Sequence, residues 1–192
     1  FNSSNNGLET GDIGGSLVLI STQTASSSST IDFTSGIDST YKEYVFKFIN
    51  IHPATDQSDF TFQVDTGTNT SYNQTVTNTY FQAYQNEAGS ATALDYLSSY
   101  DQAQGTSFID ISHYLGNAND ECCSGTLHLF DPSSTTFVKH FICRINSTNG
   151  NEYTSDYYSA GYFNTTTALT RVRFKMASGN IDSGVIKLYG IS

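Results

Sequence analysis

The stretch YYSAGYFNTTTALTRVRFKMASGNIDSGVIKLYGIS, residues 157–192, decides the fold class of this chain. Within it, TRVRFKM (170–176) alternates cations with side chains that pack well in a sheet, and an SGN turn (178–180) leads into VIKLYGI (185–191). Alternation with period two places one set of side chains on each face of a sheet. Both runs are therefore predicted to be half-buried β-strands.

Similar runs recur upstream, with Gly, Asn, Asp and Ser between them. This spacing is typical of a sandwich or barrel and not of β-α-β units. We predict an all-β protein with a single domain, a jelly-roll-like antiparallel β-sandwich over residues 13–192. Residues 1–12 lack periodicity and are expected to form an N-terminal arm or linker. The predicted strands are residues 16–20, 30–33, 44–52, 60–65, 78–83, 108–111, 126–130, 136–145, 157–163, 168–176 and 184–191.

The composition agrees with a sheet protein of one domain. The 192 residues include 13 Tyr and 13 Phe but no Trp and one Met. Aromatic and β-branched residues suit a pleated surface, and a sandwich of this length can be one unit. The run of serines at 26–29 is expected to be a loop. Residues 91–104 form either a short helix, because Leu94, Leu97 and Tyr100 recur every three positions, or a long loop.

The net charge of −10 limits the partners of the protein. Phosphate backbones and anionic lipids attract clusters of Lys and Arg and repel an acidic surface, so neither nucleic acid nor an anionic membrane surface is an expected partner. No apolar run approaches the roughly 18 residues that a membrane-spanning helix needs. The sequence therefore predicts no nucleic-acid partner and no membrane partner.

The sequence contains no recognisable catalytic motif. A nucleophile elbow, a zinc-protease helix motif, a P-loop and a dinucleotide fingerprint are all missing, and the four histidines are scattered. We therefore predict no enzyme, no catalytic residues and no cofactor. Residues 117–121, NANDE, carry oxygen ligands but lack the spacing of an EF-hand, and no CxxC pair occurs, so no metal site is predicted either.

Two clusters combine tyrosines with acids in segments that we expect to be loops. Sugars are bound by aromatic faces together with planar polar groups, so these clusters are candidate glycan contacts. The alternative is structural, because tyrosines in sandwiches commonly pack the ring and leave the hydroxyl in water. The candidate ligand-binding residues are Tyr96, Tyr100 and Asp101 in the first cluster and Tyr153, Asp156, Tyr157 and Tyr158 in the second.

The three cysteines pose a question of register. Asp131-Pro132 begins a good hairpin turn between two predicted strands. A loop of two or four residues would place Cys122 opposite Cys143, and a loop of five would place Cys123 there. We therefore predict a disulfide of Cys122 or Cys123 with Cys143, or alternatively three free, buried thiols, since an odd count leaves one cysteine over.

Several stretches together resemble a known group of proteins. They are the closing SGNIDSGVIKLYGIS (178–192), STQTAS followed by IDFT (21–34), PATD after a strand (53–56), LHLFDPSSTT (127–136) and ALTRVRF (168–174). The chain from about residue 15 onward resembles small β-sandwich proteins encoded by tailed phages, above all marine ones, and found on virion surfaces. The adjacent pair Cys122-Cys123 departs from their pattern.

This resemblance implies a location and not an activity. It points to a non-enzymatic protein of the virion surface, either a capsid decoration (cement) protein or a fibre-type structural protein, attached to other virion proteins through its N-terminal arm. We expect a homotrimer, because symmetric assembly covers exposed strand edges and virion sites impose symmetry. The alternative function is a glycan-binding receptor-recognition module of a tail fibre, or a lectin-like domain, with a host surface glycan as partner.

Overall fold

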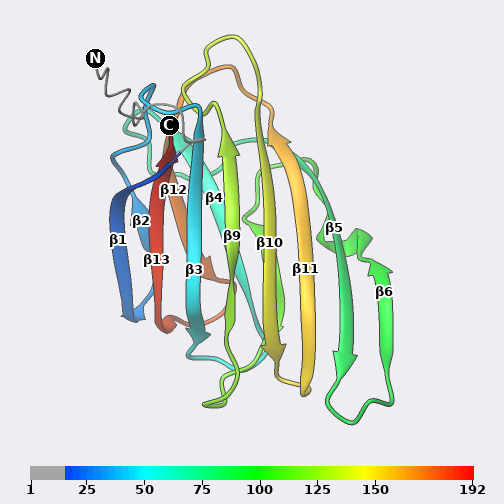
Figure 1. Ribbon diagram of the computed structural model, residues 1–192. Helices are drawn as coiled ribbons and strands as arrows, with labels where there is room; N and C mark the ends of the chain where they lie inside the picture. Colours follow the sequence, from blue (N-terminus) through cyan, green and yellow to red (C-terminus); the bar gives the residue numbers. More distant parts are fainter. Residues whose placement is uncertain (1–15) are drawn as a thin grey trace, which may run out of the picture.

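The computed structural model describes residues 16–192 and shows a single antiparallel β-sandwich (Figure 1). The predicted arm, residues 1–12, lies outside the described residues. The all-β prediction is confirmed. The strands are β1 (Leu17–Ser28), β2 (Ile31–Phe33), β3 (Glu43–Pro53), β4 (Ser58–Thr66), β5 (Val76–Asn86), β6 (Thr92–Tyr96), β7 (Ala103–Gly105), β8 (Ile109–Leu115), β9 (Cys123–Phe130), β10 (Lys139–Asn149), β11 (Tyr153–Phe163), β12 (Leu169–Met176) and β13 (Ile181–Ile191).

The strands form a large and a small sheet. The large sheet runs in the order β1-β13-β3-β9-β10-β11-β5-β6, with β7 also paired to β5. The small sheet has the order β8-β4-β12-β2, and it joins the large one through a pair between Leu115 and Asn149. In Figure 1 β5 and β6 extend sideways past the small sheet. The central strands of the small sheet, β4 and β12, therefore do not lie opposite this part of the large sheet.

A jelly roll lies within this arrangement. Setting aside β5 to β7 and the pair β10 and β11 leaves two sheets with the orders β1-β13-β3-β9 and β2-β12-β4-β8. Renumbered along the chain, these eight strands read 1-8-3-6 and 2-7-4-5, the strand order of a jelly roll with its two Greek keys. The remaining strands are two insertions into the jelly roll, and they pair with each other where β11 meets β5.

The alternation at residues 170–176 has the predicted effect. Val172, Phe174 and Met176 are buried, and the cations between them face outward. Arg173 donates two hydrogen bonds to Asp32 on β2, of 2.7 and 2.6 Å. The hydrophobic effect thus fixes which face of β12 is inward, and an ion pair links its outer face to the edge strand.

Phenylalanine rings fill the space between the sheets. The ring of Phe174 lies 5.2 Å from those of Phe46 and Phe48, and 5.9 and 6.2 Å from those of Phe60 and Phe62. The pairs with Phe46 and Phe48 meet edge to face, and the pairs with Phe60 and Phe62 are stacked. Phe174 therefore sits at the centre of the core and connects strands of both sheets.

The segment 91–104 differs from its prediction. It contains β6, a single 3-10 turn η1 (Ser98–Tyr100) and β7, and neither a helix of several turns nor one long loop. Thr92 to Tyr96 pair with β5, which satisfies one edge of their backbone and extends the large sheet. The spacing of Leu94 and Tyr96 fits a strand, and both side chains point to solvent. The predicted serine loop is also wrong in part, since β1 continues to Ser28.

The predicted disulfide is wrong. Strands β9 and β10 are neighbours as expected, but Cys143 is opposite Leu127 and Cys123 is opposite Ser147. All three cysteines are free. The connection runs from residue 131 to residue 138 and is longer than the loops we considered, because Asp131 and Pro132 bond to Lys42 and Leu169 outside the hairpin. The alternative of free thiols holds, although Cys122 is only partly buried.

Candidate functional site

A cavity of about 570 Å³ opens where the overhanging strands pass the edge of the small sheet. Its volume is within the usual range for ligand pockets. Its walls come from β5, from β8 and from the turn between β10 and β11. The lining residues are Gln82, Tyr84, His113, Tyr114, Asn149, Gly150, Asn151, Glu152, Tyr153 and Ser155.

The turn between β10 and β11 is organised by the side chain of Asn149. Its Oδ1 accepts hydrogen bonds from the backbone N–H groups of Asn151 (3.0 Å) and Tyr153 (3.2 Å). Asn side chains commonly replace backbone acceptors in this way within turns. Glu152 takes a left-handed conformation with φ 60°, and its N–H donates to the Asn149 carbonyl at 3.0 Å. The turn thereby presents Glu152 and Tyr153 to the cavity.

Tyr114 faces this turn and is also in the left-handed region, with φ 51°. That conformation is unfavourable for a bulky residue, and such strain concentrates at functional sites. The Tyr114 N–H donates to Asp59 Oδ1 at 2.9 Å, and its carbonyl accepts from the N–H of Gly150 at 3.1 Å. These two bonds hold the conformation and leave the Tyr114 side chain 41% exposed at the cavity.

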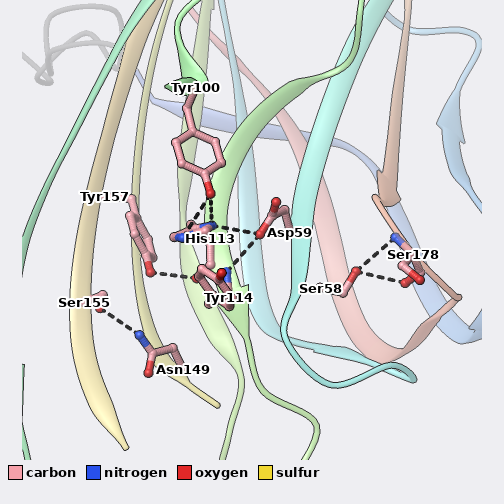
Figure 2. A network of polar contacts seen from close by, with 9 residues as sticks. All are labelled: Ser58, Asp59, Tyr100, His113, Tyr114, Asn149, Ser155, Tyr157 and Ser178. Atoms are coloured by element: carbon pink, nitrogen blue, oxygen red, sulfur yellow. Dashed lines mark hydrogen bonds and ion pairs between the residues drawn. The ribbon is translucent and has the colours of Figure 1, made fainter. Parts of the chain in front are cut away.

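His113 lines the cavity and lies at the centre of a polar network (Figure 2). Its Nδ1 is 3.0 Å from Asp59 Oδ1, and the Tyr100 hydroxyl is 2.6 Å from Nδ1 and 3.0 Å from Nε2. The Tyr157 hydroxyl donates to the His113 carbonyl at 2.7 Å. The imidazole is thus fixed between an acid of β4 and a tyrosine of η1.

Burial changes the acidity of groups in this region. Burial raises the pKa of Asp110 on β8 to about 7, and the nearby charge of Asp59 adds to the increase. Burial is also the main cause of the raised pKa values of Tyr100 and Tyr157. Both tyrosines are therefore neutral hydrogen-bonding groups at ordinary pH, and Asp110 carries only a partial charge near neutrality.

The cavity combines aromatic planes with amide groups. The rings of Tyr84 and Tyr153 meet edge to face, with centroids 5.3 Å apart. Gln82 and Asn151 add planar groups that both donate and accept hydrogen bonds. The imidazole of His113 forms hydrogen bonds with Tyr100 and Asp59. Within residues 16–192 it contacts no hydroxyl of Ser or Thr and no thiol of Cys at hydrogen-bond distance. Such a surface can hold a polar ligand with hydroxyl groups.

The second predicted cluster is split between the two faces of β11. Its residues lie in a strand and not in a loop, so odd and even positions point to opposite sides. Tyr153 lines the cavity, and Tyr157 lies beneath it, 1% exposed. Asp156 and Tyr158 are on the outer face, where Arg144 donates to Asp156 at 2.7 Å.

The first predicted cluster is divided as well. Tyr100 packs under the cavity, with its ring centroid 5.3 Å from that of Tyr80. Tyr96 is on the exposed edge strand β6, and its hydroxyl donates to Asp101. The structure therefore places Tyr153 in the cavity lining and bonds Tyr100 and Tyr157 to the lining residue His113, and it leaves Tyr96 and Asp101 outside.

Several lining residues were missed by sequence reasoning. The dipeptide Asn149-Gly150 is a turn signal that could have located the turn. A Cβ atom at Gly150 would be 2.8 Å from Asp56 Oδ1, so two turns approach each other closely at this glycine. For Tyr84 and Tyr114 the sequence holds no such signal, because their roles depend on which strands become neighbours.

Two further searches of the structure gave negative results. Over residues 16–192, no group of three or more His, Cys, Asp or Glu side chains is arranged to hold a metal ion. Within the same range, no helix has the length and apolar character needed to cross a bilayer.

Comparison with known proteins places this chain in no family. No protein-family model matches it, and no curated protein matches it. A solved structure that aligns in part is a structural genomics protein of unknown function from Bacteroides ovatus, at 6% identity and a TM-score of 0.29. The alignment covers 55% of this chain and 46% of that chain, which is less than half the length of that protein. A likeness this weak carries no argument about function.

Proposed function

We propose that this protein is a non-enzymatic recognition module that binds a saccharide in the cavity between β5, β8 and the β10–β11 turn. The observation that carries the proposal is the meeting of three tyrosines, Tyr84, Tyr114 and Tyr153, with the amides of Gln82 and Asn151 around one open cavity. Sugar rings present apolar faces to aromatic planes and hydroxyls to amides. The strained backbone of Tyr114 supports a binding role for this place.

The location that we propose is the outside of a tailed-phage virion. Support comes from the sequence resemblance described above and from the jelly-roll strand order, an architecture used in capsid and lectin domains. A fold hosts many functions, so the architecture is support by analogy only. With this location, the saccharide would belong to the surface of the host cell.

A glycan array tests the binding proposal, with affinities of the glycans bound then measured by titration calorimetry. The variants Tyr153→Ala and Tyr84→Ala should each weaken binding about tenfold or more, because each removes an aromatic wall. The matched control is Tyr158→Ala, on the opposite face of the same strand. Binding of no glycan would contradict the proposal. A loss caused by Tyr158→Ala and not by Tyr153→Ala would move the site to the outer face.

A second candidate function is structural, as a decoration or fibre-type protein that assembles as a homotrimer. It is favoured by the exposed apolar side chains on the outer face of the large sheet: Leu94 is 74% exposed, Tyr96 61% and Ile142 53%. Apolar patches on soluble proteins commonly mark contacts with other proteins. The free edge of β6 adds a further place for pairing.

Sedimentation of the full chain and electron microscopy of virions test this candidate. It predicts a trimer that Leu94→Asp converts to monomers, and density for the protein on the particle surface. A monomer at high concentration, or virions without the protein, would argue against it. The matched control is Thr92→Asp, which adds the same charge to the same strand without removing an apolar side chain.

A further inference from the structure

The charges around the cavity are of one sign. Among its described lining residues Glu152 is the one carboxylate, and neither Lys nor Arg is present. The chain has eight Lys and Arg residues in total, all within the described range, and none of them reaches the lining. A bound ligand would therefore meet a carboxylate without a neighbouring Lys or Arg.

Further acids surround the lining. Asp59 bonds to His113 and to the Tyr114 N–H, directly behind the wall formed by β8. Asp56 is so close to Gly150 that a Cβ atom there would be 2.8 Å from its Oδ1. The backbone of Glu87 also donates to the Glu152 carbonyl at 3.0 Å, which brings a further acidic residue to the same turn.

Two arginines, Arg144 and Arg173, are already paired with acids outside the cavity. Arg144 is on the outer face of β10, on the opposite side of the sheet from the cavity, and it forms a bidentate ion pair with Asp156. Arg173 is paired with Asp32 on the small sheet. An anionic group that entered the cavity would therefore find no Lys or Arg to compensate its charge and would be repelled by Glu152, and His113, the one basic side chain of the described lining, is already paired with Asp59.

We infer that the cavity is selective for uncharged saccharides and rejects sugars that carry a carboxylate, sulfate or phosphate, with Glu152 as the residue that sets this selectivity. This inference rests on the proposed saccharide binding and adds the chemical class of the ligand. Specificity of this kind comes from an unfavourable interaction with the wrong ligand as much as from contacts with the right one.

The test uses pairs of glycans on the array that differ by one acidic group, such as a galactose-terminated oligosaccharide and its sialylated and sulfated forms. In low salt, the unaltered protein should bind the neutral glycan of a pair at least tenfold more tightly than the acidic glycan. This applies to every pair of which the protein binds at least one member. The ratio should fall when the salt concentration is raised to about 0.5 M, because salt screens the repulsion.

Glu152→Gln should lower the ratio of neutral to acidic affinity about tenfold or more. The matched control Asp182→Asn removes the same charge far along the large sheet, on β13, and should leave the ratio unchanged. Equal or tighter binding of acidic glycans by the unaltered protein would overturn the selectivity but leave saccharide binding intact. The proposed role of Glu152 would also be overturned if Glu152→Gln left the ratio of neutral to acidic affinity unchanged. Absence of all glycan binding overturns the proposed function and the selectivity with it.

Discussion

The hydroxyl of Tyr157 on β11 donates a hydrogen bond of 2.7 Å to the backbone carbonyl of His113 on β8. This bond connects the large sheet to the small sheet (Figure 2), at the cavity-lining residue His113. Because Tyr157 is fully buried, its hydroxyl and the carbonyl of His113 depend on each other for their hydrogen bond. The position of His113, and of Tyr114 after it, is therefore tied to the overhanging part of the large sheet.

Tyr157→Phe should destabilise the protein by about 1–3 kcal/mol, because it removes the donor to the part-buried carbonyl of His113. It should also weaken saccharide binding, since His113 and Tyr114 lose a support. Urea unfolding measures the first effect and calorimetry the second. The control Tyr158→Phe removes a hydroxyl from the outer face and should change stability by less than about 0.5 kcal/mol. Equal effects of the two variants would contradict the role of the bond.

Asp110 should make stability depend on pH. Burial raises its pKa in the folded protein to about 7 from an ordinary value of 3.8, so the folded state binds the proton more tightly than the unfolded chain. The stability that this group contributes is complete below about pH 4 and is lost as the pH rises through about 7. Above pH 7 the folded protein instead holds an unfavourable charge.

Asp110→Asn removes this titration. The difference in unfolding free energy, variant minus unaltered protein, should increase between pH 4 and pH 8 by about 2 kcal/mol, after allowance for partial contact with solvent. Urea titrations over this range measure it. The control is Asp120→Asn, which removes the same charge from an exposed turn. A flat difference for Asp110→Asn would show that the carboxyl titrates normally.

Phe174 should be among the most sensitive positions of the core. Phe174→Ala should cost about 3–5 kcal/mol, since it opens a cavity among rings of both sheets. If this variant does not fold, Phe174→Leu should still fold with a smaller loss, visible as a lower denaturant midpoint. Phe137→Ala is the control, because Phe137 is 70% exposed and its removal should have almost no effect on stability.

The cysteines should differ in their reactivity toward iodoacetamide. Cys123 and Cys143 are each 1% exposed, whereas Cys122 is only partly buried. Burial raises the pKa of each thiol, least severely where contact with solvent remains. Mass spectrometry should therefore find one alkylated cysteine, Cys122, in the native protein and three in urea. Rapid labelling of Cys143 without denaturant, or an unreactive disulfide, would contradict the register of β9 and β10.

The architecture could be predicted from the sequence because it rests on local patterns. Residues 170–176 alternate so regularly that burial of Val172 and Phe174 follows from period two alone. The register of β9 and β10 could not be predicted, because it depends on the length of their connection. That length is set by bonds of Asp131 to Lys42, just before β3, and of Pro132 to Leu169 on β12.

The candidate site was predictable only in part. Tyrosines near residue 153 were an available signal, but treating residues 153–158 as a loop obscured the alternation that sends Asp156 and Tyr158 to the outer face. Tyr114 could not have been found, since its left-handed backbone arises from bonds to Asp59 and Gly150. Such contacts join segments that are far apart in the sequence, and no single stretch of the chain encodes them.

The two insertions into the jelly roll supply most of the cavity, and the jelly-roll strands supply most of the core. The eight jelly-roll strands hold Phe174 and the four rings around it, and the inserted strands add Phe141 and Phe163 to the same core. Most of the cavity wall comes from the inserted strands β5, β10 and β11, with β8 contributing His113 and Tyr114. Mutations at lining positions that are not buried can therefore alter what is recognised at little cost to the frame. A lineage under pressure to follow a changing partner could vary Gln82, Tyr84 and residues 151–153 while the rest of the sandwich stays the same.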